Sequence, residues 1–496
     1  MVWLSILFAA VLLAPPIDAK TFRLGTTVLP EARGNPYKTT ATTPYIFFTA
    51  LFDPLVVIDN EGAMHPGLAT SWEPVNPTTW HFHLRPGVTF SNGEPFNAEA
   101  VKVTLDFLIS DAAIAQSVAR DVEFISGARV IDDLTVEITT RAPEIFLPRY
   151  LAGINIVAPR HFTELGLDGF ALDPIGTGPF KVDDWGPERA LLSAFTDSWR
   201  APKVDALEVL ALPEATARLQ ALQTRRVDVA TNINIDHIPA LEADGFMISP
   251  RNPTRVMIIA FDTVSENSPF RDVRVRQAVN YAVNRQAIVD GLLGGLTKPA
   301  SGPAAPGEVG YDPDLKPYPY DPDRARALLA EAGYADGFSF VKEGPTGQLA
   351  ADAAVAQQVA ADLARVGINM EVRNVTLGQI IKYMTVGGWK GLAISTDFST
   401  APSLDAMRSF NRHTCSWPAK WFCDPEIQGL IDEARATFDA ERRTELTRQI
   451  VRRYHDVASS LFLYPAVSVE GVNPRVRNWA PWNDNFRYDI LDVDEN

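Results

Sequence analysis

Cysteine and long apolar runs are scarce in this sequence. Only two of its 496 residues are cysteine, Cys415 and Cys423. After the first nineteen residues, no stretch is apolar over the roughly 20 residues that a membrane-spanning helix needs. The composition, 46% hydrophobic and 21% charged, is that of an ordinary globular protein. We therefore expect a folded body without a membrane span, long enough for two or three domains.

Positive charge is also in short supply. The chain has 45 Lys and Arg residues against 61 Asp and Glu residues, which gives a formal net charge of −16. An acidic surface repels phosphate backbones and anionic lipid headgroups. We therefore expect neither nucleic acid nor a membrane surface as a partner.

Catalytic motifs are missing as well. The sequence contains no Gly-x-Ser-x-Gly, His-Glu-x-x-His or P-loop pattern. Gly176-x-Gly178 lacks the strand, loop and helix context of a phosphate-binding site. His81 and His83 face the same side of a predicted strand, where metal chelation is the alternative to a polar position in a hairpin. We expect no enzymatic activity, no cofactor and no metal site.

The N-terminal segment, residues 1–19, contains an apolar run that ends at Pro15-Pro16. The run is too short to span a bilayer. A helix break followed by a small residue is typical of the end of a secretory signal. We expect cleavage after Ala19 and export to the periplasm, and the alternative of a membrane anchor is disfavoured.

The two cysteines lie eight positions apart in a chain that we expect to be exported. In an oxidising compartment, this spacing favours a disulfide between Cys415 and Cys423 that closes a small loop. Zinc binding is the alternative, but the segment lacks a CxxC pair or a second nearby histidine.

Short β-rich runs alternate with amphipathic helices along the chain, which predicts the α/β fold class. The patterns indicate strands at 21–28, 55–58, 79–84, 134–139 and 368–375, and helices that follow Asn97, span 274–293 and 350–365, and run from Asp321-Pro322 to Gly333. No linker rich in Pro, Gly or Ser separates the two halves. We therefore expect the chain to cross between lobes more than once.

Five segments together carry a family resemblance. They are 65–72, 80–99, 175–180, 270–278 and 320–325. In this order and at these spacings they resemble the extracellular solute-binding proteins of family 5, the peptide- and nickel-binding receptors of ABC importers. The residues in them are mostly structural, so they report the fold more than the ligand.

The resemblance implies an α/β fold like that of periplasmic binding proteins (type II, similar to cluster C), with two main lobes around a ligand cleft and a smaller inserted lobe. Lobe I would comprise 20–48, 172–257 and 466–496. The small lobe would be 49–171 and lobe III 258–465. The chain would cross between the main lobes near 255–261 and 462–467.

The resemblance also implies candidate ligand contacts. Peptide-binding relatives carry an Asp, a few residues before a Pro, that pairs with the α-ammonium group of the ligand. Asp397, which precedes Pro402, resembles it, and the alternative is an Asp that caps the loop through backbone amides. Aromatic side chains suit such a cleft because they cover a ligand without demanding one sequence. The aromatic candidates are Trp389, Phe398, Tyr45 and Tyr383.

Arg408 and His413 are further candidates. Arg408 can hold a ligand carboxylate in a bidentate fork, or it can bridge to Asp405 on the surface. Relatives that import nickel chelates use a histidine in this downstream loop, and His413 resembles it. An exposed histidine without a role is the alternative.

These observations predict a substrate-binding protein of an ABC importer. We expect a monomer that captures a peptide or a similar small polar solute in the periplasm and delivers it to permease subunits in the inner membrane. A nickel chelate, a short saccharide or an opine-like conjugate is the alternative ligand. A periplasmic peptide hydrolase or chaperone of the same fold is the alternative function.

Overall fold

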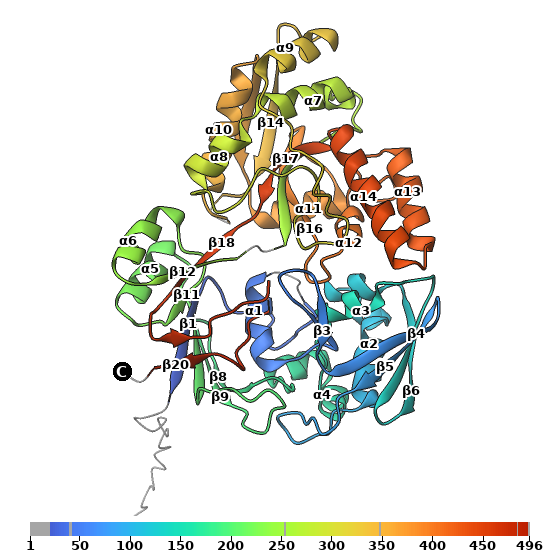
Figure 1. Ribbon diagram of the computed structural model, residues 1–496, viewed down its shortest axis with the longest axis vertical. Coiled ribbons are helices and arrows are strands. Elements are labelled where there is room, and N and C mark those ends of the chain that lie inside the picture. Colours follow the sequence, from blue (N-terminus) through green and yellow to red (C-terminus); the bar gives the residue numbers. More distant parts are fainter. Residues whose placement is uncertain (1–19, 39–41, 252–253, 347–348, 484, 495–496) are drawn as a thin grey trace, which may run out of the picture.

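The structure is a computed structural model that describes residues 20–38, 42–251, 254–346, 349–483 and 485–494, with residues 42–45 as backbone only. The predicted signal segment, 1–19, lies outside these described residues. Within them, no helix is long and apolar enough to cross a membrane. Figure 1 shows an upper body and a wider lower body, and the lower body has a left and a right part.

A seven-stranded sheet forms the left part of the lower body (Figure 1). Strand β1 lies near its centre and pairs in parallel with β10 and β11, whereas the other pairs are antiparallel. In sheet order the strands are β12 (Met247–Arg251), β18 (Ser468–Val472), β11 (Val229–Ala230), β1 (Thr21–Thr26), β10 (Ala206–Ala211), β9 (Arg189–Ala194) and β8 (Phe180–Trp185). Helices α1 (Thr42–Leu51), α5 (Ala215–Gln223) and α6 (Ile238–Ala243) contact this sheet, as does β20 (Asp492–Val493), which pairs with β19 (Val476–Arg477).

A four-stranded antiparallel sheet forms the right part of the lower body, in the order β4-β5-β7-β6. Strand β5 (Thr79–Leu84) confirms the predicted alternation, because Trp80, Phe82 and Leu84 are buried on one face. The side chain of Asn97 caps helix α2 (Ala98–Leu108), as its sequence position predicts. The other elements are β4 (Ala69–Asn76), β6 (Ile125–Asp132), β7 (Thr135–Thr140), α3 (Leu147–Tyr150), α4 (Pro159–Leu172), the pair β2 (Val56–Ile58) and β3 (Met64–Pro66), and the 3-10 helices η1 (Asp111–Ala113), η2 (Val118–Val122) and η3 (Leu151–Gly153).

A five-stranded sheet forms the middle of the upper body, in the order β15-β14-β16-β13-β17. Apolar side chains of α7, α8, α9 and α10 pack against one face of this sheet, and those of α11, α12, α13 and α14 pack against the other. The strands are β13 (Arg255–Phe261), β14 (Phe338–Gly344), β15 (Ile368–Asn374), β16 (Ala393–Ser399) and β17 (Ser460–Pro465). The helices are α7 (Val273–Ala282), α8 (Arg285–Leu292), α9 (Pro322–Glu331), α10 (Asp352–Ala364), α11 (Leu377–Val386), α12 (Ala406–Phe410), α13 (Pro425–Ala436) and α14 (Ala440–Asp456), and η5 (Pro269–Arg271) is a 3-10 helix. The 3-10 helix η4 (Ile235–His237) belongs to the lower body, where it precedes α6.

The single helix predicted over 274–293 is wrong, because the structure divides it into α7 and α8. Val283, between them, has an extended backbone, and the Asn284 side chain accepts a hydrogen bond from the Ala287 N–H as the N-cap of α8. The apolar spacing continues through the break, so periodicity alone does not reveal it. An asparagine that bonds to nearby backbone amides favours a helix start over a helix interior.

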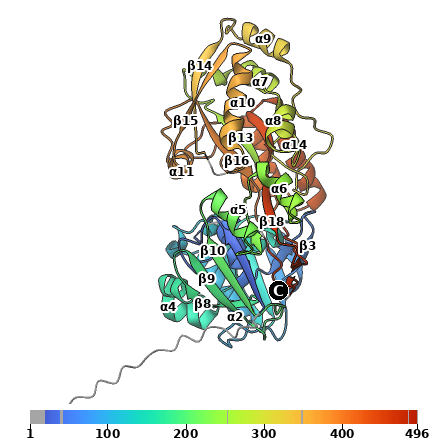
Figure 2. The same ribbon diagram turned by 90° about the vertical axis from the view of Figure 1, so that its left-hand side faces the viewer.

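Two segments connect the lower left sheet to the upper sheet. The chain passes from β12 to β13 and returns from β17 to β18. The two connections run side by side, since the Ala466 N–H donates to the Arg255 carbonyl oxygen at 2.8 Å. Figures 1 and 2 show the upper and lower bodies stacked along the long axis of the molecule. The lobe boundaries themselves stay a prediction, and those at 48/49 and 171/172 fall inside α1 and α4.

Candidate functional site

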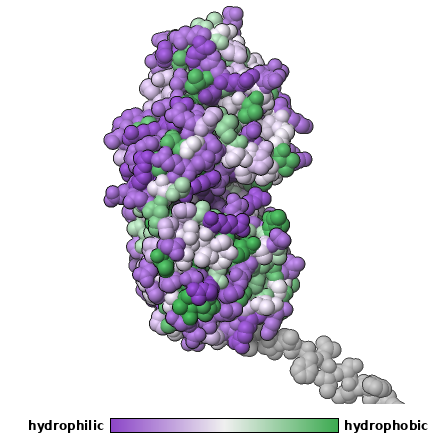
Figure 3. Space-filling view, turned by 90° about the vertical axis from the view of Figure 1, so that its right-hand side faces the viewer, coloured by the Kyte–Doolittle hydropathy of each residue, from purple (hydrophilic) through white to green (hydrophobic). Residues whose placement is uncertain are grey.

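A cavity of about 670 Å³ lies where η2 of the lower body approaches the upper sheet. Its volume is in the range that holds a small organic ligand. Figure 3 shows that the molecule is hollowed between its upper and lower bodies on one face. The polar lining includes Ser117, Arg120, Asp121, Glu123, Lys342, Asp352, Thr385, Ser395, Thr396, Asp397, Ser399, Arg408, Asn411, Arg412, Ser416 and Arg435, and the apolar lining includes Met257, Ile258, Leu349, Val355, Val359, Leu377, Ile380, Met384, Leu463 and Tyr464.

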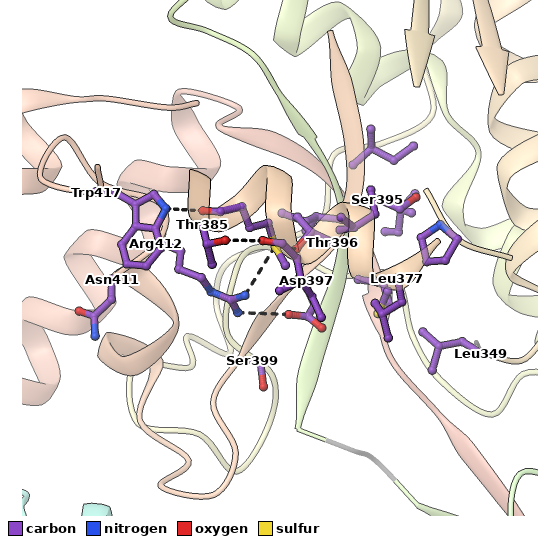
Figure 4. Close-up of a pocket in the computed structure, with 18 of the residues that line it drawn as sticks. Leu349, Leu377, Thr385, Ser395, Thr396, Asp397, Ser399, Asn411, Arg412 and Trp417 are labelled. Atoms are coloured by element: carbon purple, nitrogen blue, oxygen red, sulfur yellow. Dashed lines mark hydrogen bonds and ion pairs between the residues drawn. The ribbon is translucent and has the colours of Figure 1, made fainter. Parts of the chain in front are cut away.

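Asp397 lies on β16 and lines this cavity (Figure 4). Its Oδ2 lies 3.6 Å from Arg255 Nη1, and its Oδ1 lies 3.6 Å from Arg412 Nη2. These distances allow ion pairs but exceed those of direct hydrogen bonds. Burial lowers the pKa of Arg412, and the charge of Asp397 opposes this shift. The Asp397 carboxylate is thus held between two cations with room to accept a donor from the cavity.

Arg408 also lines the cavity, and its guanidinium is already engaged. Its Nε and Nη2 donate to the two carboxylate oxygens of Asp121 at 2.9 Å each. Asp121 belongs to η2 of the lower body, so this bidentate pair joins the two bodies. Burial lowers the pKa of Arg408, but the charge and hydrogen bonds of Asp121 outweigh it and raise the pKa.

The alternative of a surface bridge from Arg408 to Asp405 is wrong. Asp405 is fully buried, where it accepts hydrogen bonds from Arg443 at 3.0 Å and from the Tyr150 hydroxyl at 3.1 Å. A carboxylate that caps α12 at the Met407 N–H faces the protein interior and is out of reach for a surface arginine.

Phe398 and Tyr383 lie in the core, Trp389 is partly buried against it, and the side chain of Tyr45 is outside the described residues. Phe398 is fully buried, and it points to the face of the sheet opposite to that of Asp397. Tyr383 is buried, and its hydroxyl lies 3.5 Å from a Glu343 carboxylate oxygen. Trp389 packs against Trp421 with ring centroids 5.6 Å apart. None of these three side chains is among the residues that line the cavity.

His413 is buried, so the alternative of an exposed loop histidine is wrong. Its ring stacks on Phe398 with centroids 3.8 Å apart. Burial, together with the positive charge of Arg412, holds the pKa of His413 well below its usual value. In the part of the chain that the structure describes, no group of three or more His, Cys, Asp or Glu side chains is placed to bind a metal.

The predicted disulfide is confirmed, because Cys415 and Cys423 are bonded. The loop that it closes carries Ser416 and Trp417, which line the cavity. Trp417 Nε1 donates to the Met384 carbonyl oxygen at 2.6 Å, so the loop is tied to α11 (Figure 4). The cross-link therefore supports one wall of the cavity.

The sequence interpretation missed Asp121, Arg412, Arg255 and Lys342. Of these four residues, only Lys342 belongs to a recognisable local pattern, because it follows Phe338 and Phe340 at alternate positions, in a segment that was not among the predicted strands. Asp121 and Arg412 come from unrelated segments of the chain. Only the packing of η2 against the loop after α12 brings them to the same cavity.

Comparisons with known proteins agree with this architecture. The model of the bacterial extracellular solute-binding proteins, family 5 (middle region), matches residues 63–414. The dipeptide-binding protein of Escherichia coli (strain K12) is 28% identical over 97% of this chain and 96% of its own length. The glutathione-binding protein GsiB of Pectobacterium atrosepticum is 29% identical over 74% of this chain and 73% of its own length.

A solved structure shows the same fold. The ABC transporter-associated periplasmic binding protein DppA from Helicobacter pylori, in complex with the peptide STSA, superposes with a TM-score of 0.81 at 22% sequence identity. The superposition covers 96% of this chain and 98% of that one.

Proposed function

Because the chain belongs to the bacterial extracellular solute-binding proteins of family 5, we propose that it captures a small polar solute, with a peptide as the favoured ligand, in the cavity between its two bodies. It acts in the periplasm as a monomer. It releases the ligand unmodified to the permease subunits of an ABC importer. The names of two relatives, the dipeptide-binding protein of E. coli and the glutathione-binding protein GsiB of P. atrosepticum, support a peptide as the favoured ligand.

The observation that carries this proposal is the cavity itself. It lies where the two bodies meet, near the two neighbouring connections at 254–255 and 466–467, which allow hinge movement. The Arg408–Asp121 pair bridges the bodies at its rim. A ligand in this place contacts both bodies at once, as capture by closure requires.

Asp397 is the proposed contact for the α-ammonium group of the ligand. Its carboxylate faces the cavity from β16 without a direct hydrogen bond to either neighbouring arginine. An ammonium group placed there gains a charge-assisted hydrogen bond in a site that excludes most water.

The first test identifies the solute that co-purifies with the protein, by denaturing it and analysing what is released by mass spectrometry. A peptide supports the proposal. If a nickel chelate, a saccharide or an opine-like conjugate is released instead, the peptide assignment is wrong but the transport role stands. Steady conversion of added peptides into products contradicts a binding protein.

The second test is Asp397→Asn, which keeps the shape of the side chain and removes its charge. We expect a loss of about 1.5–3 kcal/mol, or roughly ten- to a hundredfold in affinity, by calorimetry. N-acetylated ligand binds the wild type weakly, and its affinity falls little further in the Asp397→Asn variant. Asp432→Asn, at an exposed position of α13, is the matched control. Equal weakening of free and acetylated ligands assigns Asp397 to a structural cap.

A further inference from the structure

Lys342 is a buried cation on the wall of the cavity. Only 3% of its surface is exposed, and it lies on β14 near the centre of the upper sheet. Within the described residues its ammonium has neither a hydrogen-bond acceptor nor an ion-pair partner. Burial lowers its pKa to about 8, and the more distant charge of Asp352 opposes this shift. A buried charge without a partner destabilises a protein unless a ligand satisfies it.

Neighbouring carboxylates are committed elsewhere. Glu343 points to the other face of the sheet, where it accepts hydrogen bonds from the Lys390 and Gly391 N–H groups at 3.1 Å each. Asp352 accepts a hydrogen bond from the Leu349 N–H at 3.2 Å, at the start of α10. Neither carboxylate lies close enough to Lys342 for an ion pair, so the protein itself leaves this cation unsatisfied.

The strand register places Lys342 on the same face as Asp397. Alternate residues of a strand share a face, and Phe340 and Ala393 both pack in the cluster that faces α10. Lys342 follows Phe340 by two positions, and Ser395 and Asp397 follow Ala393 by two and four. Lys342, Ser395 and Asp397 therefore line one side of the sheet.

A glycine leaves room for the ammonium group. A Cβ on Gly344 would lie 2.9 Å from Lys342 Nζ and 2.8 Å from Ser395 Oγ, so these two groups are neighbours. Asp397 is two residues further along β16, or about 6.6–6.8 Å. The cation at Lys342 and the anion at Asp397 are thus separated by a distance that a compact molecule spans.

We infer that Lys342 binds a carboxylate of the ligand, so that the ligand is a compact zwitterion of dipeptide size with its ammonium group at Asp397. This inference rests on the proposed function. The carboxylate lies between the Lys342 ammonium and the Ser395 hydroxyl, and the apolar part of the ligand lies against Val355 and Val359 of α10.

The test uses protein that has been freed of bound solute by unfolding and refolding. One mixture of dipeptides is offered in free, N-acetylated, C-amidated and doubly blocked forms, and mass spectrometry measures which forms are retained. We expect free dipeptides to be retained, and C-amidated forms to bind ten- to a hundredfold more weakly.

Lys342→Met keeps the aliphatic stem and removes the charge, and Lys382→Met, exposed on α11, is the control. We expect Lys342→Met to bind free dipeptides ten- to a hundredfold more weakly than the wild type does. Its affinity for free dipeptides then equals its affinity for the C-amidated forms. The unfolding midpoint of this variant stays equal or rises, because it removes a buried charge without leaving a counterion unpaired. A lower midpoint with equal loss of all forms assigns Lys342 a structural role and overturns the inference.

The blocked forms separate the two proposals. Retention of C-amidated but not N-acetylated dipeptides overturns the role of Lys342 and leaves that of Asp397. Retention of N-acetylated but not C-amidated dipeptides overturns the role of Asp397 and leaves that of Lys342. If no form is retained, the peptide assignment fails, and this inference fails with it.

Discussion

At the scale of single residues, Glu308 of the upper body is a buried acid with a raised pKa. It is buried, and its carboxylate oxygens accept hydrogen bonds from Thr400 Oγ1 at 2.6 Å and from the Ala305 N–H at 2.9 Å. Burial raises its pKa from 4.5 to about 7, and the charge of Asp405 contributes to the shift. The folded protein therefore keeps a proton on Glu308 at pH values where the unfolded chain has lost it.

This difference predicts how Glu308→Gln changes stability with pH. Below pH 4.5 Glu308 is protonated in both the folded and the unfolded state, so it does not lower the free energy of unfolding. Above this pH the wild type loses stability until about pH 7, by up to about 3 kcal/mol. The glutamine side chain is neutral at every pH. Its carbonyl oxygen accepts a hydrogen bond from the Ala305 N–H, and its amide group donates one to Thr400 Oγ1. We expect urea unfolding to show equal stability near pH 4.5 and a more stable variant at pH 8.

Glu242→Gln, exposed on α6, is the control and leaves the difference near zero at both pH values. A difference between wild type and Glu308→Gln that does not vary with pH contradicts the raised pKa of Glu308.

At the scale of elements, the loop closed by Cys415 and Cys423 connects α12 to α13 and carries part of the cavity wall. The cross-link spans a sequence separation of 8 residues. A loop of this length restricts the unfolded chain by about 2–3 kcal/mol in the chain-entropy model.

We therefore expect the double variant Cys415→Ser and Cys423→Ser to lose about 2–3 kcal/mol of unfolding free energy in urea. Its ligand affinity falls as well, since Ser416 and Trp417 are no longer held against α11. Reduction of the wild type reproduces both effects, and the reducing agent leaves the double variant unchanged. A double variant as stable as the oxidised wild type rules out this role of the loop.

At the scale of the whole molecule, the Arg408–Asp121 pair joins the upper and lower bodies at the cavity. The side chains are 14% and 16% exposed, so water screens the pair only in part. A partly buried, bidentate pair across an interface slows dissociation more than it speeds association. We expect this pair to hold the closed, liganded arrangement together.

Arg408→Met and Asp121→Asn each remove the pair, and we expect either change to weaken ligand binding by about 1–2 kcal/mol, mostly through faster dissociation. The double variant is no weaker than the worse single variant, because both changes remove the same interaction. Stopped-flow dissociation and small-angle scattering of the liganded protein measure the effect. Arg442→Met, at the exposed pair with Glu433, is the control. Unchanged dissociation rates contradict a closure role.

The sequence by itself determined the features that depend on near neighbours. The alternation in 79–84, the caps at Asn97 and Asp321 and the left-handed Gly333 after α9 were all predictable, since each depends on contacts within a few residues. The five spaced segments identified the family, and the cysteine spacing identified the disulfide. These are properties of short stretches and their order.

Only the tertiary structure decided which side chains share the cavity. Phe398 follows Asp397 directly, yet it faces the core, because neighbours on a strand point to opposite faces. Arg408 meets Asp121, 287 positions away, only because η2 of the lower body packs against the upper one. Lys342 reaches the cavity through the register of β14 beside β16. Local patterns carry no information on such long-range packing, because many side-chain pairings are compatible with the same sequence of helices and strands.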